Sequence, residues 1–188
     1  MEVQDKLLEK YGVTIVEAVE DFGKLDFVLR ELFGGKGREI ELSIVEKIIT
    51  LEDRLENEKA WITIEDAFLT TIVLEAVGDH DKKNILNTVL DDSKIISDIL
   101  TLNRIPQTSG YRKVNSLIQN GMLMPQGFVS LYDGKKVAKY KSVFENIVIM
   151  MEKNKVIVRA LPASEAVEKS IIMQMVASRL NYGHIRCT

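Results

Sequence analysis

The chain of 188 residues is long enough for one large domain or two small ones, and 46% hydrophobic with 28% charged residues is an ordinary globular composition. No run approaches the roughly 20 consecutive apolar residues of a membrane-spanning helix, and the charged N-terminus MEVQDKLLEK is unlike a signal peptide. The single cysteine, Cys187, excludes an intrachain disulfide and a cysteine zinc site. We therefore expect a cytoplasmic protein that does not enter a membrane and folds by packing alone.

Charge is distributed unevenly along the chain. Residues 1–75 carry 9 Lys and Arg against 18 Asp and Glu, a net charge of −9, whereas residues 76–188 carry 16 against 10, a net charge of +6. Such an asymmetry is typical of a nucleic-acid-facing segment joined to a different module. Chance segregation of solvated surface charge is the alternative.

Apolar residues recur at three- and four-residue steps in the first 75 residues, and this periodicity predicts helices in VTIVEAVEDF, DFVLRELF and GREIELSIVEKIITLEDRL. The segment FGGKG at 33–37 is predicted to end a helix, because it lacks the GxxxxGK[ST] frame of a phosphate loop and follows no strand. Thr63 and Asp66 resemble a capping box that begins the helix FLTTIVLEAV. Gly78 and Asp79 are predicted to end that helix and cap the next.

Three helices are predicted after Asp79. The first is HDKKNILNTVLDD, the second SKIISDILTLN begins at Ser93, and the third runs from about Pro106 to Asn120 before Gly121. MLMPQ and FVSLY then read as a β-hairpin joined at Gly127. The pattern leaves the conformation of DGKKVAKYKS open.

The last part of the chain predicts a second pair of strands, FENIVIMM and VIVRAL, around residues 152–155, and then the amphipathic helix AVEKSIIMQMVASRL. The expected fold class is α+β and mainly helical. We predict an acidic helical domain over 1–76, a winged helix-turn-helix domain over 77–143, and a β-hairpin with a C-terminal helix over 144–188 as a possible dimerisation element.

The stretch ISDIL…RIPQTSGYRKVNSLIQNGMLMPQGFVSLYDGKK, within residues 79–136, resembles the ArsR-type and related prokaryotic winged-helix transcriptional regulators over about a third of the chain. The resemblance implies that Ile105, Gly110, Val114 and Leu117 are buried. It implies an outward, DNA-contacting set on the same helix: Gln107, Thr108, Ser109, Tyr111, Arg112 and Lys113.

Elementary recognition chemistry agrees with that outward set. A helix fits the major groove of DNA, short polar side chains at its N-terminal half reach base edges, and arginine grips guanine through two hydrogen bonds. A solvated helix face is the alternative interpretation of Tyr111 and its two basic neighbours. Gly110 departs from the small aliphatic residue usual in the family and costs about 0.5–1 kcal/mol in a helix. It indicates either close approach of another helix or a tolerated weakness.

Four lysines follow the predicted hairpin closely enough to contact phosphates, which would give affinity and salt sensitivity but little sequence choice. They are Lys135, Lys136, Lys139 and Lys141. We expect Lys135 and Lys136 to bind DNA. An exposed amphipathic connector is the alternative.

No metal, cofactor or catalytic activity is expected. His80 and His184 lack partners at metal-ligand spacing, and a soft-metal site would have to gather widely spaced side chains: Met150, Met151, Met173, Met175, His184 and Cys187. Methionines at such spacing usually fill a core. The chain also lacks a nucleophile–base pair, an HExxH motif, a dinucleotide loop and paired carboxylates in a recognisable frame.

The sequence thus predicts a transcriptional regulator that binds double-stranded DNA as a homodimer, at a near-palindromic site with half-sites about 10 bp apart or a multiple of it. The acidic N-terminal region would be a sensor, a dimerisation module or a contact for transcription machinery. The alternative is a winged-helix adaptor that binds proteins and never reads DNA.

Overall fold

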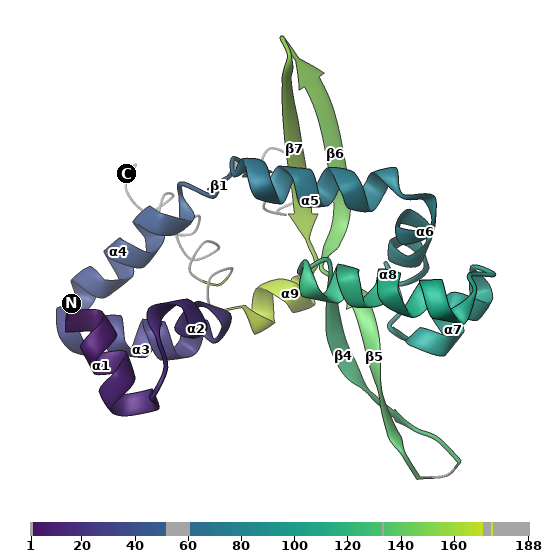
Figure 1. Ribbon diagram of the computed structural model, residues 1–188. Helices are drawn as coiled ribbons and strands as arrows, with labels where there is room; N and C mark the ends of the chain where they lie inside the picture. Colours follow the sequence, from purple (N-terminus) through teal and green to yellow (C-terminus); the bar gives the residue numbers. More distant parts are fainter. Residues whose placement is uncertain (1, 52–60, 133, 171–173, 175–188) are drawn as a thin grey trace, which may run out of the picture. The chain divides into compact units, whose positions relative to one another are not determined.

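The computed structural model describes residues 2–51, 61–132, 134–170 and 174, and it contains two compact units (Figure 1). One unit is Met1–Thr50 together with the residues from Val167 onward, and the other is Leu51–Ala166. Helices and antiparallel sheets make up the described fold, so the predicted mixed class is confirmed. The units divide the chain differently from the predicted domains, because residues on both sides of 77 and of 143 share one core.

The N-terminal unit contains four consecutive helices: α1 (Glu2–Tyr11), α2 (Ile15–Glu20), α3 (Phe22–Phe33) and α4 (Gly35–Val45). A capping box begins α2, in which Glu17 N–H donates to the Thr14 hydroxyl and Thr14 N–H donates to the Glu17 carboxylate at 2.7 Å. A small apolar core holds α1, α2 and α3 together: Leu7, Ala18, Leu25, Val28 and Leu29.

The segment FGGKG turns the chain from α3 into α4. Gly34 has φ 54° and separates the helices, as predicted, while Gly35 already belongs to α4. A Cβ on Gly37 would lie 2.6 Å from the Leu29 carbonyl oxygen, so glycine permits the close approach of α4 to α3. The helix predicted to continue through Leu55 is wrong beyond Val45, because turns and strand β1 (Ile49–Leu51) follow; residues 52–60 lie outside the described ranges.

The second unit carries two antiparallel sheets and most of the remaining helices. In chain order its elements are β2 (Ile62–Ile64), α5 (Ala67–Gly78), α6 (His80–Thr88), β3 (Lys94–Ile95), α7 (Ile96–Leu102), α8 (Gln107–Gln119), β4 (Leu123–Ser130), β5 (Lys136–Ser142), β6 (Phe144–Glu152) and β7 (Lys155–Pro162). Helix α9 (Ser164–Lys169) crosses the boundary between the units. Strands pair in the orders β3–β5–β4 and β2–β7–β6.

Of the three residues predicted to begin helices by capping, two are wrong and one is confirmed. Asp66, rather than Thr63, caps α5 by accepting from Leu69 N–H, because Thr63 lies within β2. Ser93 does not begin α7, since the short strand β3 comes between them. Asp79 caps α6 as predicted, and its carboxylate accepts from Lys82 N–H at 2.9 Å.

The first hairpin lies later in the chain than predicted. Strand β4 continues through Gly127, which has φ 80° and sits where the register shifts between Pro125 and Phe128. A glycine in this conformation admits a β-bulge without reversing the chain. The reversal occurs between the end of β4 at Ser130 and the start of β5 at Lys136, and β5 is the segment whose conformation the pattern left open.

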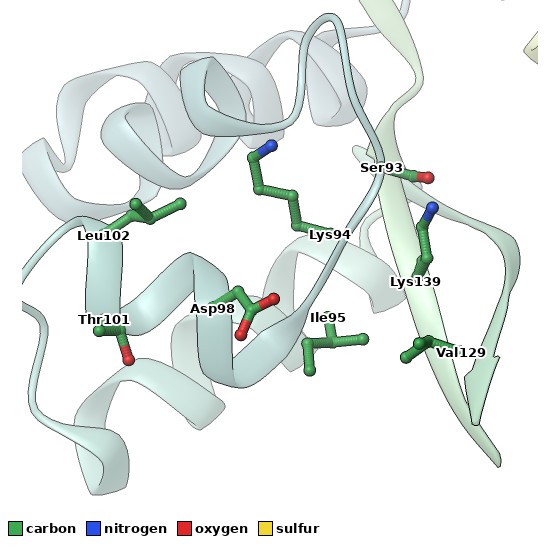
Figure 2. Close-up of a pocket in the computed structure, with 8 residues that line it drawn as sticks. All are labelled: Ser93, Lys94, Ile95, Asp98, Thr101, Leu102, Val129 and Lys139. Atoms are coloured by element: carbon green, nitrogen blue, oxygen red, sulfur yellow. The ribbon is translucent and has the colours of Figure 1, made fainter. Parts of the chain in front are cut away.

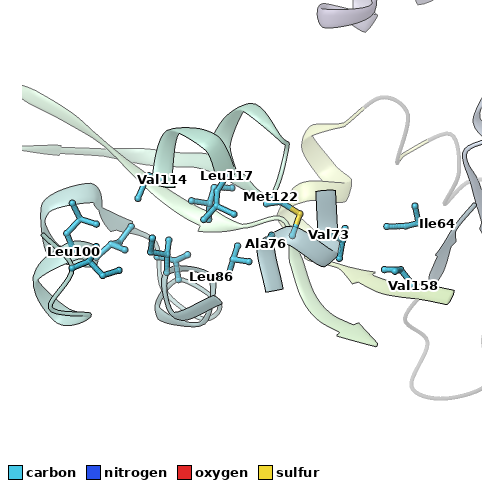
Figure 3. Packing of buried hydrophobic residues seen from close by; sticks show 14 residues of the cluster. Ile64, Val73, Ala76, Leu86, Leu100, Val114, Leu117, Met122 and Val158 are labelled. Atoms are coloured by element: carbon cyan, nitrogen blue, oxygen red, sulfur yellow. The ribbon is translucent and has the colours of Figure 1, made fainter. Parts of the chain in front are cut away.

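One apolar core joins both sheets to the helices of this unit (Figure 3). Val114 and Leu117 of α8 are fully buried and pack with Leu100 and Leu86 of the preceding helices. The core continues to Val158 of β7, so helices α5 to α8 and the β2–β7–β6 sheet share one core.

The second predicted strand pair is confirmed as β6 and β7, joined by a two-residue turn in which Lys153 and Asn154 have φ 48° and 65°. The predicted C-terminal helix is confirmed only as α9; residues 171–173 and 175–188 lie outside the described ranges.

Candidate nucleic-acid interface

Helix α8 has one buried face and one open face. Gly110, Val114 and Leu117 are buried at helical spacing, as predicted. The opposite positions expose Thr108, Tyr111, Arg112, Asn115 and Gln119. Asn115 was not among the predicted contacts, although its place four residues after Tyr111 on the same face was a signal in the sequence.

The first turn of α8 fixes part of the predicted contact set. Gln107 and Thr108 are exposed, whereas Ser109 is half-buried and its hydroxyl donates to the Pro106 carbonyl at 3.1 Å. Only the lone pairs of that hydroxyl remain to accept a bond from a ligand.

Gly110 marks a close approach, which decides between the two interpretations of this glycine. A Cβ at this position would lie 2.8 Å from Leu100 Cδ1 of α7 and 3.1 Å from Ile105 Cγ2. Both neighbours are buried. The glycine therefore allows α7 and α8 to pack at the distance this turn requires.

Lys113 points to α6 instead of the open face. Its ammonium nitrogen lies 2.7 Å from each carboxylate oxygen of Asp79 and 3.0 Å from an oxygen of Asp81. The hydrogen bond from Lys113 is the main cause that holds the pKa of Asp79 below its usual value, and the same bond raises the pKa of Lys113. The pair fixes α8 against the start of α6.

The turn between α7 and α8 has its own side-chain support. The Asn103 amide donates to the Ile99 carbonyl at 2.7 Å and to Thr88 Oγ1 at 2.8 Å. Arg104 follows in the left-handed conformation, with φ 55°, and is exposed beside the beginning of α8.

The four lysines predicted to act together divide between different surroundings. Side chains alternate along a strand, so Lys136 lies on the opposite face of β5 from Lys139 and Lys141. Lys141 is only 14% exposed and pairs with Glu165 at 2.6 Å, so its charge is already matched. Lys135 lies in the exposed hairpin turn.

Aromatic side chains complete the β4–β5 hairpin, and sequence reasoning did not single them out. Phe128 is 70% exposed, and the register places it on the same face as Lys136. Tyr132 is fully exposed at the tip. The hairpin therefore presents two exposed aromatic rings, one on the face of Lys136 and one at the tip.

A cleft of about 540 Å³ opens between α7, β3 and the hairpin (Figure 2). Its lining residues are Ser93, Lys94, Ile95, Asp98, Thr101, Leu102, Val129 and Lys139. Within the described ranges, no hydrogen bond or ion pair engages the side chain of Lys94 or of Lys139. The cleft thus adds two available ammonium groups beside the hairpin.

Basic residues dominate the whole stretch from the turn to the end of β5. Residues 104–141 contain seven Lys and Arg against a single acidic residue, Asp133. This local excess accounts for the positive character of the second half of the chain and suits a polyanion.

No family model and no curated protein matches the chain. Among solved structures, HlyU from Vibrio cholerae N16961 is similar, with 11% sequence identity, a TM-score of 0.29, and coverage of 65% of this chain and 96% of that one. A likeness at this level supports no argument about the fold or the function of this chain.

Two further findings concern other kinds of site. Among the described residues no three His, Cys, Asp or Glu side chains gather as metal ligands. Four members of the soft-metal alternative lie outside the described ranges: Met173, Met175, His184 and Cys187. No helix of the described part is long and apolar enough to cross a membrane.

Proposed function

We propose that residues 51–166 bind double-stranded DNA through α8 and the β4–β5 hairpin, and that the protein regulates transcription as a homodimer. The observation that carries the proposal is the two-sided character of α8. Gly110, Val114 and Leu117 pack its buried face into the core, while its open face presents hydrogen-bonding side chains next to a basic hairpin. A rigid helix with such a face is what the major groove accepts.

Different side chains of α8 would read different groups. Arg112 suits the two acceptors of guanine and Asn115 suits the acceptor and donor of adenine, while Thr108 at the first turn is short enough to contact a phosphate or a thymine methyl. Tyr111, 42% exposed, adds an aromatic surface with a hydroxyl at its end. Sequence preference would therefore come chiefly from Arg112 and Asn115.

The hairpin would provide affinity. Lys135 and Lys136 would neutralise phosphates, and Phe128 and Tyr132 would contact sugar and base surfaces in the adjoining groove. Lys113 supports the site in a different way from that predicted, because its ion pairs orient α8 rather than leaving an ammonium group for DNA.

Exposed apolar side chains favour the second candidate, a protein-binding adaptor. Leu102 on α7 is 62% exposed and Phe128 on the hairpin 70% exposed. An adaptor would bind DNA, if at all, without sequence preference, so its selected duplexes would show no shared motif.

Selection of bound duplexes from a random DNA library tests the proposal. The wild-type chain, Arg112→Ala and the double variant Lys135→Ala/Lys136→Ala are compared, with Lys36→Ala in α4 as the control for loss of an exposed lysine. We expect the wild type and the control to enrich the same near-palindromic motif. The motif should degrade at single positions in Arg112→Ala, and the double variant should weaken all sequences alike.

Absence of any enriched motif, together with absence of binding at physiological salt, would reject DNA reading and favour the adaptor. Loss of the motif in the Lys36→Ala control would show that α8 and the hairpin are not the reading surface.

A further inference from the structure

Strand β6 forms the outer edge of its sheet within the described residues. The order β2–β7–β6 leaves one side of its nine residues without a neighbouring strand. The half of β6 nearest the turn is also exposed on both faces: Ile149 is 41%, Met150 40% and Met151 79% exposed. An open edge with apolar side chains is a template for pairing with another strand.

The hairpin turn defines which backbone groups are available on that edge. Glu152 faces Lys155 across the two-residue turn, and the residues that close such a turn bond to each other. Alternate residues then direct their N–H and C=O groups to the opposite side. Along β6 these outward residues are Ile147, Ile149 and Met151.

The edge lacks the devices that usually prevent pairing. Natural edges are blunted by proline, lysine or a bulge, and residues 146–151 read NIVIMM, without proline or charge. The bulge of β6 lies earlier, between Phe144 and Asn146, and it ends the regular stretch without interrupting it.

The sequence of β6 is complementary to itself. Antiparallel pairing about a two-fold axis at Ile149 places Ile149 opposite its own copy and Ile147 opposite Met151. In this register the N–H and C=O groups that point away from β7 in one copy meet the same groups of the other copy. The same register brings Glu145 of one copy close to Lys153 of the other, at both ends of the pairing. A one-residue shift in either direction would place backbone groups that point outward opposite groups that point toward β7, and one of the two shifts would also oppose Glu145 to Glu152.

We propose that a second copy of this chain pairs with β6 in this register and joins two sheets across a two-fold axis. The inference deepens the proposed function, because it names the surface that makes the homodimer. Within the second unit the β6–β7 and β4–β5 hairpins extend in opposite directions (Figure 1). Pairing at β6 therefore leaves the exposed face of α8 and the β4–β5 tip uncovered.

Site-specific disulfide trapping tests the register in the full chain. Ile149→Cys and the matched control Met150→Cys, which replaces an equally exposed neighbour, are each made in a Cys187→Ser background. Directly opposed residues of an antiparallel pair have Cα atoms roughly 5.5 Å apart, within the range of a disulfide. Residue 150 would oppose Val148, so its two copies lie too far apart. We expect oxidation to give a covalent dimer from Ile149→Cys and little from Met150→Cys.

Sedimentation of the uncrosslinked chain provides the second readout. The wild type should have twice the mass of one chain, and Ile149→Lys should be monomeric with an unchanged circular dichroism spectrum, because two lysines would face each other only in the dimer. A monomeric wild type, equal crosslinking at 149 and 150, or a dimer that persists in Ile149→Lys would overturn the inference. A β6-linked dimer that enriches no DNA motif would instead reject the proposed function and leave this inference standing.

Discussion

The Lys113 ammonium nitrogen lies 2.7 Å from both carboxylate oxygens of Asp79, the residue that caps α6. One carboxylate thus begins one helix and anchors another, α8, through a lysine that is 34 residues later in the chain. The two roles can be separated by substitution. Their separation shows how much of the orientation of α8 depends on the ion pair.

We expect Asp79→Ser to keep the helix cap and lose the ion pair. Because the pair is partly exposed, its loss should lower the free energy of unfolding by only about 0.5–1 kcal/mol. Asp79→Ala should lose both and cost about 1 kcal/mol more. Urea unfolding at neutral pH measures both values. The pKa of Asp79 is lowered in the fold, so the difference between wild type and Asp79→Ser should persist at neutral pH and vanish as pH falls through that lowered pKa, below the ordinary value of 3.8. Equal stabilities for Ser and Ala would contradict the capping role.

Gly110→Ala should destabilise the second unit, despite the better helix propensity of alanine. The propensity gain is about 1 kcal/mol, while a methyl group pressed against Leu100 and Ile105 costs about 1–3 kcal/mol. A double-mutant cycle with Leu100→Ala measures the coupling between the new methyl group and the Leu100 side chain. We expect the loss from Gly110→Ala to be smaller in the Leu100→Ala background, since the new methyl group then fills vacated space. Additive losses would show that the contact does not decide the choice of glycine.

The same glycine shows where sequence reasoning reached its limit. Helical spacing placed Gly110, Val114 and Leu117 on one face, because periodicity alone determines which residues share a face. It could not show that Leu100 approaches residue 110, because that contact depends on the geometry of the turn at Asn103 and Arg104.

The predictions of the hairpin turn and of the DNA-contacting lysines were wrong for related reasons. Gly127 is compatible with a turn and with a bulge, and only the pairing of β4 with β5 distinguishes them. Lys113 and Lys141 read as free cations in the sequence, whereas their partners Asp79 and Glu165 lie 34 and 24 residues away in the chain. Ion pairs of such sequence separation leave no local pattern.

Gly37→Ala should have a larger effect than Gly110→Ala, because its new methyl group would meet backbone. The added Cβ would lie 2.6 Å from the Leu29 carbonyl oxygen and 2.8 Å from the carbonyl carbon, which can move only if α3 and α4 separate. We expect a loss of roughly 3 kcal/mol, at the upper end of overpacking costs. Gly35→Ala is the matched control, since it begins the same helix with no atom within 4 Å, and it should stabilise by about 0.4–1 kcal/mol by restricting the unfolded chain. Amide hydrogen exchange across residues 22–45 follows both, and similar effects of the two variants would disprove the close approach.

Glu41 makes the stability of the N-terminal unit depend on pH. Its side chain is 1% exposed, neither carboxylate oxygen has a hydrogen-bond partner among the described residues, and burial, followed by the charge of Asp26, raises its pKa from 4.5 to about 7. Between these values the unfolded chain releases a proton that the folded chain retains, so stability falls as pH rises through this window. With about 1.4 kcal/mol for each tenfold change in proton affinity, the loss reaches roughly 3 kcal/mol.

Glu41→Gln should remove this contribution. The variant and the wild type should have similar stabilities below pH 4.5, and the variant should be the more stable one above pH 7. Hydrogen exchange of α3 and α4 amides at pH 5 and pH 8 gives the comparison. If the difference in stability between the wild type and the variant is the same at pH 5 and at pH 8, Glu41 ionises normally.

Lys136 and Lys141 offer a matched test of the DNA-binding surface, because they lie on the same strand but differ in exposure and in ion pairing. Lys136 is exposed, whereas Lys141 is 14% exposed and bound to Glu165. Each phosphate contact contributes roughly one to the slope of log affinity against log salt.

We expect Lys136→Ala to reduce that slope by about one and to weaken all duplexes alike. Lys141→Ala should leave the slope unchanged and lower only the thermal stability of the hairpin. Titrations of one selected duplex between about 50 and 200 mM salt decide the matter. A lower slope in Lys141→Ala, or an unchanged slope in Lys136→Ala, would place the DNA on a different face of the hairpin from the one that carries Phe128.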